Sequence, residues 1–386
     1  MDRRIYLDNS ATTKICKEAL DKYAEASLEC FGNPSSLHAL GFEAEKLMSA
    51  ARAEILASIA AKDARVIFTA SGSEANNLAI IGRAHAKDRY RGAKIITTDG
   101  EHASVTEPLE KLAGEGFRIV KIPTVGGKLD MAALEAELTS DVVLVSMMMV
   151  NNETGALYDI PAVSRLMKMR SKEALLHVDA TQSYMKIPFS KASLGADMIT
   201  LSSHKVEGPK GVGALVVGEN VIKARGLSPM ILGGGQEGGM RSGTENVPAI
   251  AAFGEAVHIG RAMIRERYAK MDSLRTSLIE KLATLPEVSP TLPTSHAPNI
   301  LNITLPKIKS ETMLHYLSSF GIYVSSGSAC SSNTGHTSSA LVAYGRSAEE
   351  ADSSIRISLS HSNTAEDIDA LVEALGAGLA KLSRIK

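Results

Sequence analysis

Short apolar runs alternate with helical patterns between about residue 60 and residue 218, and no other feature of the sequence constrains the fold as strongly. The apolar runs cover residues 65–68, 94–97, 118–122, 142–147, 175–178, 198–201 and 213–217. The helical patterns between them include residues 74–88, 103–114, 131–138 and 162–172. Nearly continuous apolar strands separated by helices predict an α/β domain with a mostly parallel sheet covered on both faces. Ligands of such sheets lie at the carboxyl ends of the strands.

The rest of the chain predicts a second, smaller domain. After Pro248 a long helical pattern runs to about residue 285, and residues 299–305 and 322–325 are typical of strands. Thr364 is followed three residues later by Asp367, a capping pair that predicts the start of a last helix. We expect a large domain over residues 15–258 and a small α+β domain built from residues 1–14 and 259–386.

Composition and charge exclude several classes of protein. The chain has 386 residues, of which 44% are hydrophobic and 22% are charged, and its formal net charge is −1. A net charge this close to zero does not predict binding to nucleic acid or to an anionic membrane surface. The longest apolar run, residues 142–150, is interrupted by Ser146 and is too short to span a bilayer. No apolar signal core precedes the first acidic residue, so we expect a cytoplasmic protein. From the net charge and the short apolar runs we expect binding to neither nucleic acid nor membrane.

A carboxylate and a lysine follow two of the predicted strands. One strand ends in Asp179, and the next leads through Ser202, Ser203 and His204 to Lys205. A pyridoxal phosphate enzyme needs such a pair, because the lysine amine forms a Schiff base with the cofactor aldehyde and the aspartate pairs with the protonated pyridine nitrogen. A solvated surface lysine and a turn aspartate are the alternatives, and the spacing alone does not decide between them.

Two stretches are suited to hold a phosphate. Residues 68–77 combine a strand, a small-residue turn with Gly72 and Ser73, and the start of a helix, where exposed backbone N–H groups favour an anion. The serines and the histidine before Lys205 add side-chain donors. An ordinary strand-to-helix turn with a serine cap is the alternative for the first stretch.

Further polar residues follow predicted strands at the same sheet edge. His102 follows the second strand and suits an acid or base over a cofactor ring. Gln182, three residues after Asp179, is placed to reach the ring hydroxyl. Asn152 lies in a polar cluster after the fourth strand. A structural histidine and an ordinary Asn-Gly turn remain the alternatives.

An arginine and a cysteine in the C-terminal part are also candidates. Arg356 sits in an apolar alternation, where a substrate carboxylate and an internal salt bridge are equally natural partners. Cys330 lies in a run of small polar residues that suits an exposed, reactive thiol, although a loop cysteine without a role fits as well. Cys16 and Cys30 form with it no CxxC and no metal-ligand spacing, so we expect no metal site.

Ten short motifs, in order along almost the whole chain, resemble a cysteine desulfurase of the NifS/IscS type. That family lies within class V of the pyridoxal phosphate-dependent aminotransferases, which have fold type I. The motifs occupy residues 6–13, 32–38, 101–102, 150–153, 177–182, 202–205, 208–211, 241–244, 325–330 and 354–356.

The resemblance implies a fold and a set of site residues. It implies a large domain with a mostly parallel seven-stranded sheet and a smaller α+β C-terminal domain, which carries the active cysteine on a mobile loop of about residues 325–340. The implied catalytic residues are Lys205, Cys330 and His102. The implied cofactor-binding residues are Gly72, Ser73, His102, Asn152, Asp179, Gln182, Ser202, Ser203, His204, Lys205 and Thr244, the last reaching in from the other subunit of a homodimer. Asn152 and Arg356 would bind the substrate carboxylate.

The resemblance also implies a reaction with pyridoxal 5′-phosphate as cofactor. L-cysteine would become L-alanine, while its sulfur moves to Cys330 as a persulfide and then to an acceptor protein. That acceptor would be an iron–sulfur cluster scaffold or an enzyme of thio-cofactor synthesis or tRNA thiolation. Another class V enzyme is the alternative: an aminotransferase, a β-eliminating lyase or a selenocysteine lyase. A docking protein that has the fold without catalysis is a further alternative.

Three features depart from the family pattern. Ser71 stands where relatives commonly have glycine, and residues 333–338 lack the Glu-Pro-Ser pattern common in IscS-like members. The sequence ends at Lys386, without the C-terminal extension through which those members engage their scaffold. The identity of the sulfur acceptor is therefore open.

Overall fold

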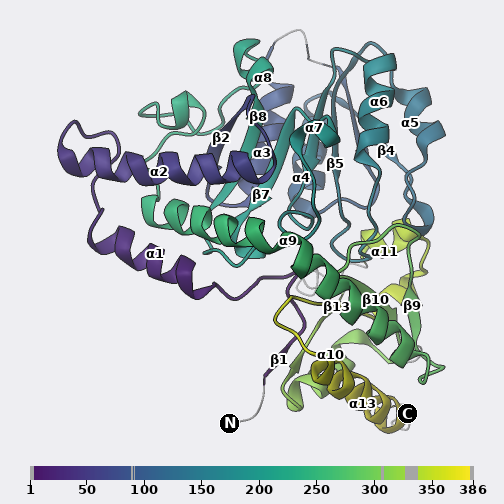
Figure 1. Ribbon diagram of the computed structural model, residues 1–386. Coiled ribbons are helices and arrows are strands. Elements are labelled where there is room, and N and C mark those ends of the chain that lie inside the picture. The colour runs from purple at the N-terminus through teal and green to yellow at the C-terminus, as the bar shows by residue number, and fades with distance from the viewer. Residues whose placement is uncertain (1–3, 88–89, 91, 306–307, 327–337, 383–386) are drawn as a thin grey trace.

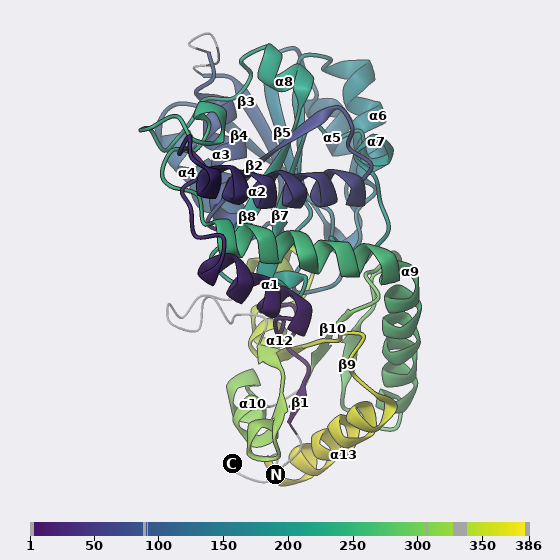
Figure 2. The same ribbon diagram turned by 60° about the vertical axis from the view of Figure 1, so that its left-hand side comes forward.

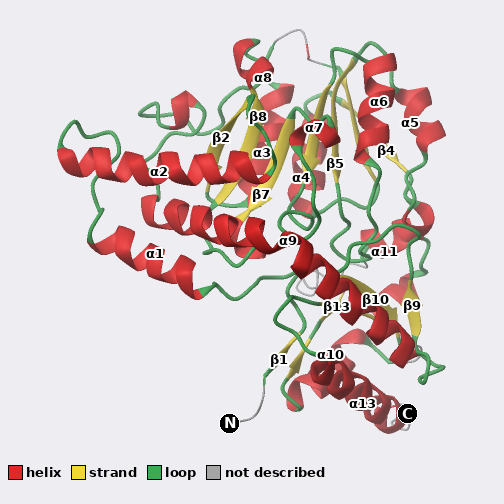
Figure 3. Ribbon diagram, in the orientation of Figure 1, coloured by secondary structure: helices red, strands yellow, loops and turns green. Residues whose placement is uncertain are grey.

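The computed structural model describes residues 4–87, 90, 92–305, 308–326 and 338–382, and its largest element is a seven-stranded sheet (Figures 1 and 3). The strand order is β2-β8-β7-β6-β5-β3-β4. β8 is antiparallel to both of its neighbours, and all other pairs are parallel. The strands are β2 (Ala64–Thr69), β3 (Lys94–Thr98), β4 (Arg118–Ile122), β5 (Val142–Met148), β6 (Leu175–Asp179), β7 (Met198–Ser202) and β8 (Gly213–Gly218). All seven apolar runs of the sequence are therefore strands, which confirms the predicted mostly parallel sheet.

Helices cover both faces of this sheet, as the apolar strands require. One face packs on α3 (Gly72–Ala84) and α4 (Ala103–Gly114). The other face packs on a larger set of helices: α2 (Ala39–Ser58), α5 (Met131–Glu137), α6 (Ile160–Arg170), α7 (Lys191–Leu194) and α9 (Val247–Leu282). The short α8 (Glu219–Lys223) follows β8, and α1 (Lys17–Leu28) packs on α9.

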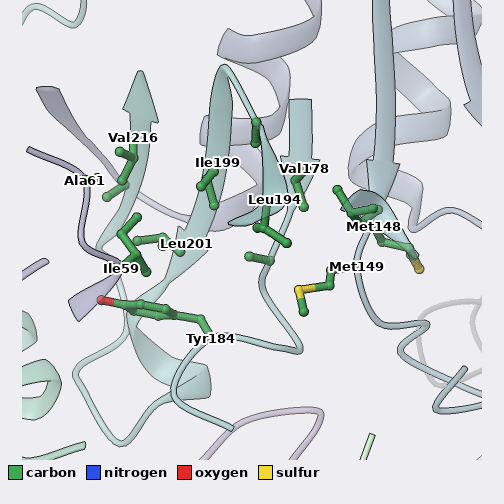
Figure 4. Close-up of a cluster of buried hydrophobic side chains, with 14 of the residues drawn as sticks. Ile59, Ala61, Met148, Met149, Val178, Tyr184, Leu194, Ile199, Leu201 and Val216 are labelled. Atoms are coloured by element: carbon green, nitrogen blue, oxygen red, sulfur yellow. The ribbon is translucent and has the colours of Figure 1, made fainter. Parts of the chain in front are cut away.

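The second face illustrates how the core forms. Figure 4 shows Ile199 and Leu201 of β7 beside Val178 and Val216 of the neighbouring strands, over the ring of Tyr184. These side chains alternate with residues of the opposite face, because successive strand residues point to opposite sides. Burial of this apolar surface is the main source of stability for the sheet.

A second sheet has four antiparallel strands in the order β12-β13-β10-β9. They are β9 (Ser289–Thr291), β10 (Ile300–Thr304), β12 (Ser325–Ser326) and β13 (Ser354–Ser358). β1 (Ile5–Tyr6) pairs in parallel with β11 (Ile322–Tyr323). The helices of this region are α10 (Ser310–Ser319), α11 (Ser339–Tyr344), α12 (Ala348–Asp352) and α13 (Ala365–Leu382). Ile355 and Ile357 of β13 point into a separate apolar core, whereas Arg356 between them points to the opposite face.

α9 joins the two cores (Figures 1 and 2). Phe253 and Val257 belong to the core of the large sheet, and Leu274 and Leu278 belong to the second core. Among the described residues, α9 is the one helix long and apolar enough to cross a bilayer, but 56% of its most apolar stretch is buried inside the protein. Its apolar side chains are thus used for packing. The predicted division of the chain at residues 258 and 259 falls within this continuous helix and stays a prediction.

Two details differ from the sequence prediction, and one agrees closely. The helix expected over residues 74–88 begins at Gly72 and ends at Ala84. Thr364 and Asp367 form the predicted capping pair, because the Thr364 N–H donates to the Asp367 carboxylate (3.2 Å) and the Asp367 N–H donates to Thr364 Oγ1 (3.4 Å). The reversed direction of β8 was not predicted.

Candidate active site

The N-terminal segment after β1 holds the residues around Lys205. Lys205 lies in a single 3₁₀ turn, Ser203–Lys205, directly after β7. Its Nζ donates to the carbonyl oxygens of Ser10 (2.5 Å) and Ala11 (2.7 Å). Thr13 donates to the His204 carbonyl through both its N–H (2.8 Å) and its hydroxyl (2.9 Å). The amine of Lys205 is thereby fixed at the carboxyl edge of the large sheet.

Asp179 ends β6 and is buried. Its Oδ1 accepts the Thr181 N–H (2.9 Å), and its Oδ2 accepts the side-chain amide of Asn76 (2.8 Å). The same Asn76 amide also donates to Ser104 Oγ (2.9 Å). The sequence analysis did not single out Asn76. A polar residue among the buried positions of a helix needs a hydrogen-bond partner, and that requirement is the signal that could have identified it.

His102 is the N-cap of α4. Its Nδ1 accepts the Ser104 N–H (3.1 Å) and lies 2.8 Å from Ser104 Oγ. Burial lowers the pKa of His102, and the carboxylate of Asp179 partly offsets this. The imidazole is therefore neutral at pH 7, and because Nδ1 is an acceptor, the ring carries its proton on Nε2.

The turn between β2 and α3 is closely packed. Ser71 is the N-cap of α3, and its hydroxyl accepts the Glu74 N–H (3.1 Å). A Cβ on Gly72 would lie 3.1 Å from Cβ of Ser202 and 3.3 Å from Oγ1 of Thr181, so the end of β7 and the chain after β6 both lie against this turn. The side chain of Ser73 is exposed. Ser71 thus serves as the cap, and the first residue of the helix, Gly72, carries no side chain.

The residues between β7 and Lys205 differ in their surroundings. Ser202 and Ser203 are buried, and Ser203 Oγ has no hydrogen-bond partner among the described residues. Nδ1 of His204 lies 3.1 Å from Thr12 Oγ1. Burial, together with the positive charges of Lys205 and two other lysines, lowers the pKa of His204 to about 4, so its ring is neutral at pH 7.

Gln182 carries a buried acceptor without a donor. Its Nε2 donates to the carbonyl oxygen of Ser10 (3.0 Å), which also accepts from Nζ of Lys205. Its Oε1 is buried and has no partner among the described residues. A buried polar atom of this kind costs free energy unless a ligand or water satisfies it.

Arg356 of β13 is buried against the same N-terminal segment. It donates to the Asp8 carboxylate (3.0 Å) and to the carbonyl oxygen of Asn152 (3.0 Å), while its Nε lacks a partner among the described residues. Burial raises the pKa of Asp8, and the guanidinium of Arg356 offsets part of this rise. The internal salt bridge considered from the sequence is therefore present.

Lys186 is a second buried amine that the sequence did not single out. Its Nζ has no hydrogen-bond partner among the described residues. Burial, with a smaller contribution from the charge of Lys205, lowers the pKa of Lys186 to about 7. The interior around Lys205 therefore disfavours a second full positive charge.

Thr244 is not among these contacts, and another predicted site residue lies outside the described part of the chain. Thr244 is exposed and lines a cavity of about 180 Å³ with Thr69, Ala70 and Gly211. Cys330 lies outside the described residues. Within the part of the chain that the structure describes, no group of His, Cys, Asp or Glu is arranged to hold a metal ion.

Residues 5–371 match the family model of the class-V aminotransferases. The chain belongs to this family. The class V protein "Cysteine desulfurase IscS 1" of Archaeoglobus fulgidus is 38% identical over 379 residues, which cover 98% of this chain and 97% of that relative. A solved NifS-like protein has a TM-score of 0.90 at 35% identity and covers 99% of this chain and 100% of its own. The structure of SspA in complex with cysteine has a TM-score of 0.80 at 29% identity and covers 94% of this chain and 100% of its own.

Pyridoxal 5′-phosphate is the cofactor of this class V enzyme, and the residues present fit it. The fit rests on three observations. The unpaired Oε1 of Gln182 requires a donor such as the ring hydroxyl. A carboxylate, Asp179, and an amine, Lys205, both lie at the carboxyl edge of the sheet. Gly72 leaves a turn at the N-terminus of α3 without a side chain, which suits a phosphate.

Proposed function

We propose that the residues gathered around Lys205 carry out cysteine desulfuration: L-cysteine is converted to L-alanine, and the sulfur is transferred to Cys330. The observation that supports this most is the convergence of Lys205, Gln182 and Arg356 on the N-terminal segment of residues 8–11, with Asp179 at the end of β6, three residues before Gln182. An amine, a carboxylate and a carboxylate-binding arginine are the three groups that an amino acid substrate with this cofactor requires.

Each residue has a definite task in this proposal. When bound, pyridoxal phosphate supplies an aldehyde for the Lys205 amine and a ring that withdraws electrons from the substrate. Asp179, held in place by Asn76, pairs with the ring nitrogen. Neutral His102 holds a proton on Nε2 above the site and exchanges it with the reacting groups. The substrate carboxylate is held by the side chain of Asn152 and by Arg356, whose Nε has no partner within the described part of the chain.

The sulfur transfer balances without an outside oxidant. The thiolate of Cys330 attacks the sulfur of the substrate, so an S–S bond forms and the carbon–sulfur bond breaks. The electron pair of the broken bond stays with carbon, which takes up a proton to give the methyl group of alanine. The products are L-alanine and a Cys330 persulfide, whose outer sulfur is then passed to the thiol of an acceptor protein.

Two variants test this assignment. Lys205→Ala is expected to lose the visible absorbance of the enzyme-linked cofactor and the formation of alanine. Cys330→Ala is expected to keep the absorbance and the spectral response to cysteine but to form no persulfide. Wild-type protein given cysteine without reductant should gain one sulfur, about 32 Da, on the Cys330 peptide. Extra sulfur on Cys16 or Cys30, or full alanine formation by Cys330→Ala, would refute the proposed sulfur transfer.

A second copy of this chain is the partner that the surface favours. Large apolar side chains are exposed from the end of α1 to the first turn of α2 and in the loop that carries Thr244: Leu28, Phe31, Leu37, Phe42 and Leu232. The loop is attached to α2 by paired hydrogen bonds between Arg52 and Glu237 (2.6 and 2.9 Å), so both groups belong to one region of the surface. Such a patch is typical of an interface. Light scattering should give twice the chain mass, and a Leu37→Glu variant should be a monomer; a monomeric wild type would exclude the homodimer.

The acceptor of the sulfur is a protein thiol of an iron–sulfur scaffold or of a thio-cofactor or tRNA thiolation enzyme. Cytoplasmic localisation also remains a proposal. Persulfide transfer from ³⁵S-labelled enzyme to purified candidate acceptors would identify the acceptor, because only a true acceptor should gain label at a rate that matches alanine formation.

A further inference from the structure

The chain turns back sharply directly after Lys205. The Ser203 carbonyl accepts the N–H groups of Val206 (2.9 Å) and Gly208 (3.1 Å), so the turn closes around the lysine. Gly208 is packed so closely that a Cβ there would clash with Ser203 Oγ. Just before it, Glu207 has a φ of 64°, a left-handed conformation that residues with a side chain rarely adopt. The turn that carries Lys205 therefore contains a strained position, which the surrounding contacts must hold.

The backbone of Glu207 is held by the N-terminal segment. Its N–H donates to Thr13 Oγ1 (2.8 Å), and its carbonyl accepts the Cys16 N–H (2.9 Å). The Thr13 hydroxyl in turn donates to the carbonyl of His204, on the other side of Lys205 (2.9 Å). Both flanks of the lysine are thus fixed to one stretch of chain, and the direction of the Glu207 side chain is set with them.

The carboxylate of Glu207 lies between α9 and the chain that follows β13. Its Oε2 forms an ion pair with Nη1 of Arg267 in α9 (3.0 Å), and its Oε1 lies 3.3 Å from Nδ1 of His361. The side chain of Arg267 is only 10% exposed and that of Glu207 20%, so this ion pair is shielded from water and is stronger than one at the surface. His361 follows Arg356 by five residues. One carboxylate therefore connects the turn of Lys205 to α9 and to the chain that leaves β13.

We propose that Glu207 is a positioning residue for Lys205, whose ion pair with Arg267 holds the left-handed turn and thereby keeps the lysine amine in place to react with the cofactor aldehyde. The inference rests on the proposed function, in which Lys205 forms the bond to the cofactor. The carboxylate meets its partners only while the chain turns as it does, so these contacts stabilise a backbone conformation that is unfavourable by itself. Bond formation depends steeply on the placement of the two reacting atoms, and a shift of about 1 Å costs up to about a hundredfold in rate.

Attachment of pyridoxal phosphate to the full-length apo-protein tests the proposal. The rate of attachment is followed by the visible absorbance of the enzyme-linked cofactor, and equilibrium dialysis measures binding of pyridoxine phosphate, which lacks the aldehyde. Glu207→Ala and Arg267→Met are each expected to slow attachment by about tenfold or more, with the Kd for pyridoxine phosphate within about threefold of wild type. Combining the two substitutions should add little, since both break one ion pair.

Two further variants separate the side chain from the backbone. Glu207→Gly removes the carboxylate but adopts a positive φ without strain, so it should lose less of the attachment rate than Glu207→Ala. Arg267→Lys keeps a positive charge opposite the carboxylate and should retain most of the rate. A rate in Glu207→Gly below that in Glu207→Ala would contradict the role of the carboxylate in holding the turn.

Glu137→Ala is the matched control. It removes an ion pair of similar length with a buried amine, Nζ of Lys94 (2.9 Å), at the amino-terminal end of β3. Its attachment rate should stay within about threefold of wild type. Equal losses in Glu137→Ala and Glu207→Ala would overturn the proposal, as would a normal rate in Glu207→Ala or an equal loss of affinity for pyridoxine phosphate.

Lys205→Ala, measured in parallel, distinguishes this proposal from the function on which it rests. If that variant still gains the absorbance of the enzyme-linked cofactor, the proposed function itself fails. If it does not, and the Glu207 and Arg267 variants attach the cofactor at the normal rate, only the positioning role is refuted.

Discussion

Asn76→Ala should weaken cofactor binding although Asn76 lies behind Asp179. The substitution removes the donor to Asp179 Oδ2 (2.8 Å) and the donor to Ser104 Oγ (2.9 Å). A hydrogen bond to a charged group contributes about 1.5–3 kcal/mol, and a tenfold change in affinity corresponds to about 1.4 kcal/mol. Because Asp179 is buried and, within the described part of the chain, would keep the Thr181 N–H as its one remaining partner, we expect the Kd for pyridoxal phosphate to rise by about tenfold or more.

The unfolding free energy should fall as well, by about 1–2 kcal/mol in the apo-protein, because a buried carboxylate loses a donor. The loss is partly offset, since the unpaired Oδ1 of Asn76 disappears with the side chain. Cofactor titration followed by absorbance and urea unfolding of the apo-protein measure the two effects.

Asn77→Ala is the matched control. Asn77 is the next residue of α3, and its amide donates only to the backbone carbonyls of Ser73 (2.9 Å) and Ser104 (3.4 Å). Its effect on the Kd should stay below about threefold. Equal affinities for the two variants, with equal stabilities, would show that Asn76 does not support Asp179 and would refute the reasoning.

Three further predictions follow from the site and its interface. Arg356→Lys should raise the KM for cysteine by about tenfold or more with the cofactor spectrum intact, because a point charge cannot replace the planar guanidinium; an unchanged KM would leave Arg356 with the Asp8 salt bridge alone. Burial raises the pKa of Glu101 from 4.5 to about 8, so the folded state binds the proton of this carboxyl group more tightly than the unfolded state. The unfolding free energy of wild type, measured relative to Glu101→Gln, should therefore fall as the pH rises from about 5 to about 8. Urea unfolding at several pH values measures this slope, and a rise with pH would contradict the prediction. Thr244→Ala should weaken cofactor binding only in the dimer, and equal loss in a monomeric Leu37→Glu background would refute its role across the interface.

The sequence predicted the strands well because six of the seven apolar runs form strands that are buried along most of their length, so each shows as a nearly continuous apolar stretch; β4, at the edge of the sheet, is only partly buried. The direction of β8 was missed, although a signal existed: the ten residues between Ser202 and Gly213 contain no crossover helix, and a parallel connection needs about a dozen residues or more. Lys205 and Asp179 were predicted as a pair because Asp179 ends one strand and Lys205 lies three residues after the end of the next.

The supporting residues could not be found in this way. The Asn76–Asp179 contact joins positions 103 residues apart, and the contact of Lys205 with Ser10 joins positions 195 residues apart. No local pattern encodes such distances, because they depend on the order of the strands and on the path of the N-terminal segment. The contact between Glu153 and Ser338 depends likewise on where α11 packs.

The alternation along β13 limits how this enzyme can change over evolutionary time. Ile355 and Ile357 face the second core and Arg356 faces Asp8 and the candidate site, so inserting or deleting one residue in the strand would turn the arginine into apolar surroundings and an isoleucine toward Asp8. The pairing of β13 with β10 and β12 would change register by the same one residue. Point substitutions can therefore retune substrate preference at this strand, whereas changes in length must be confined to the segments outside it.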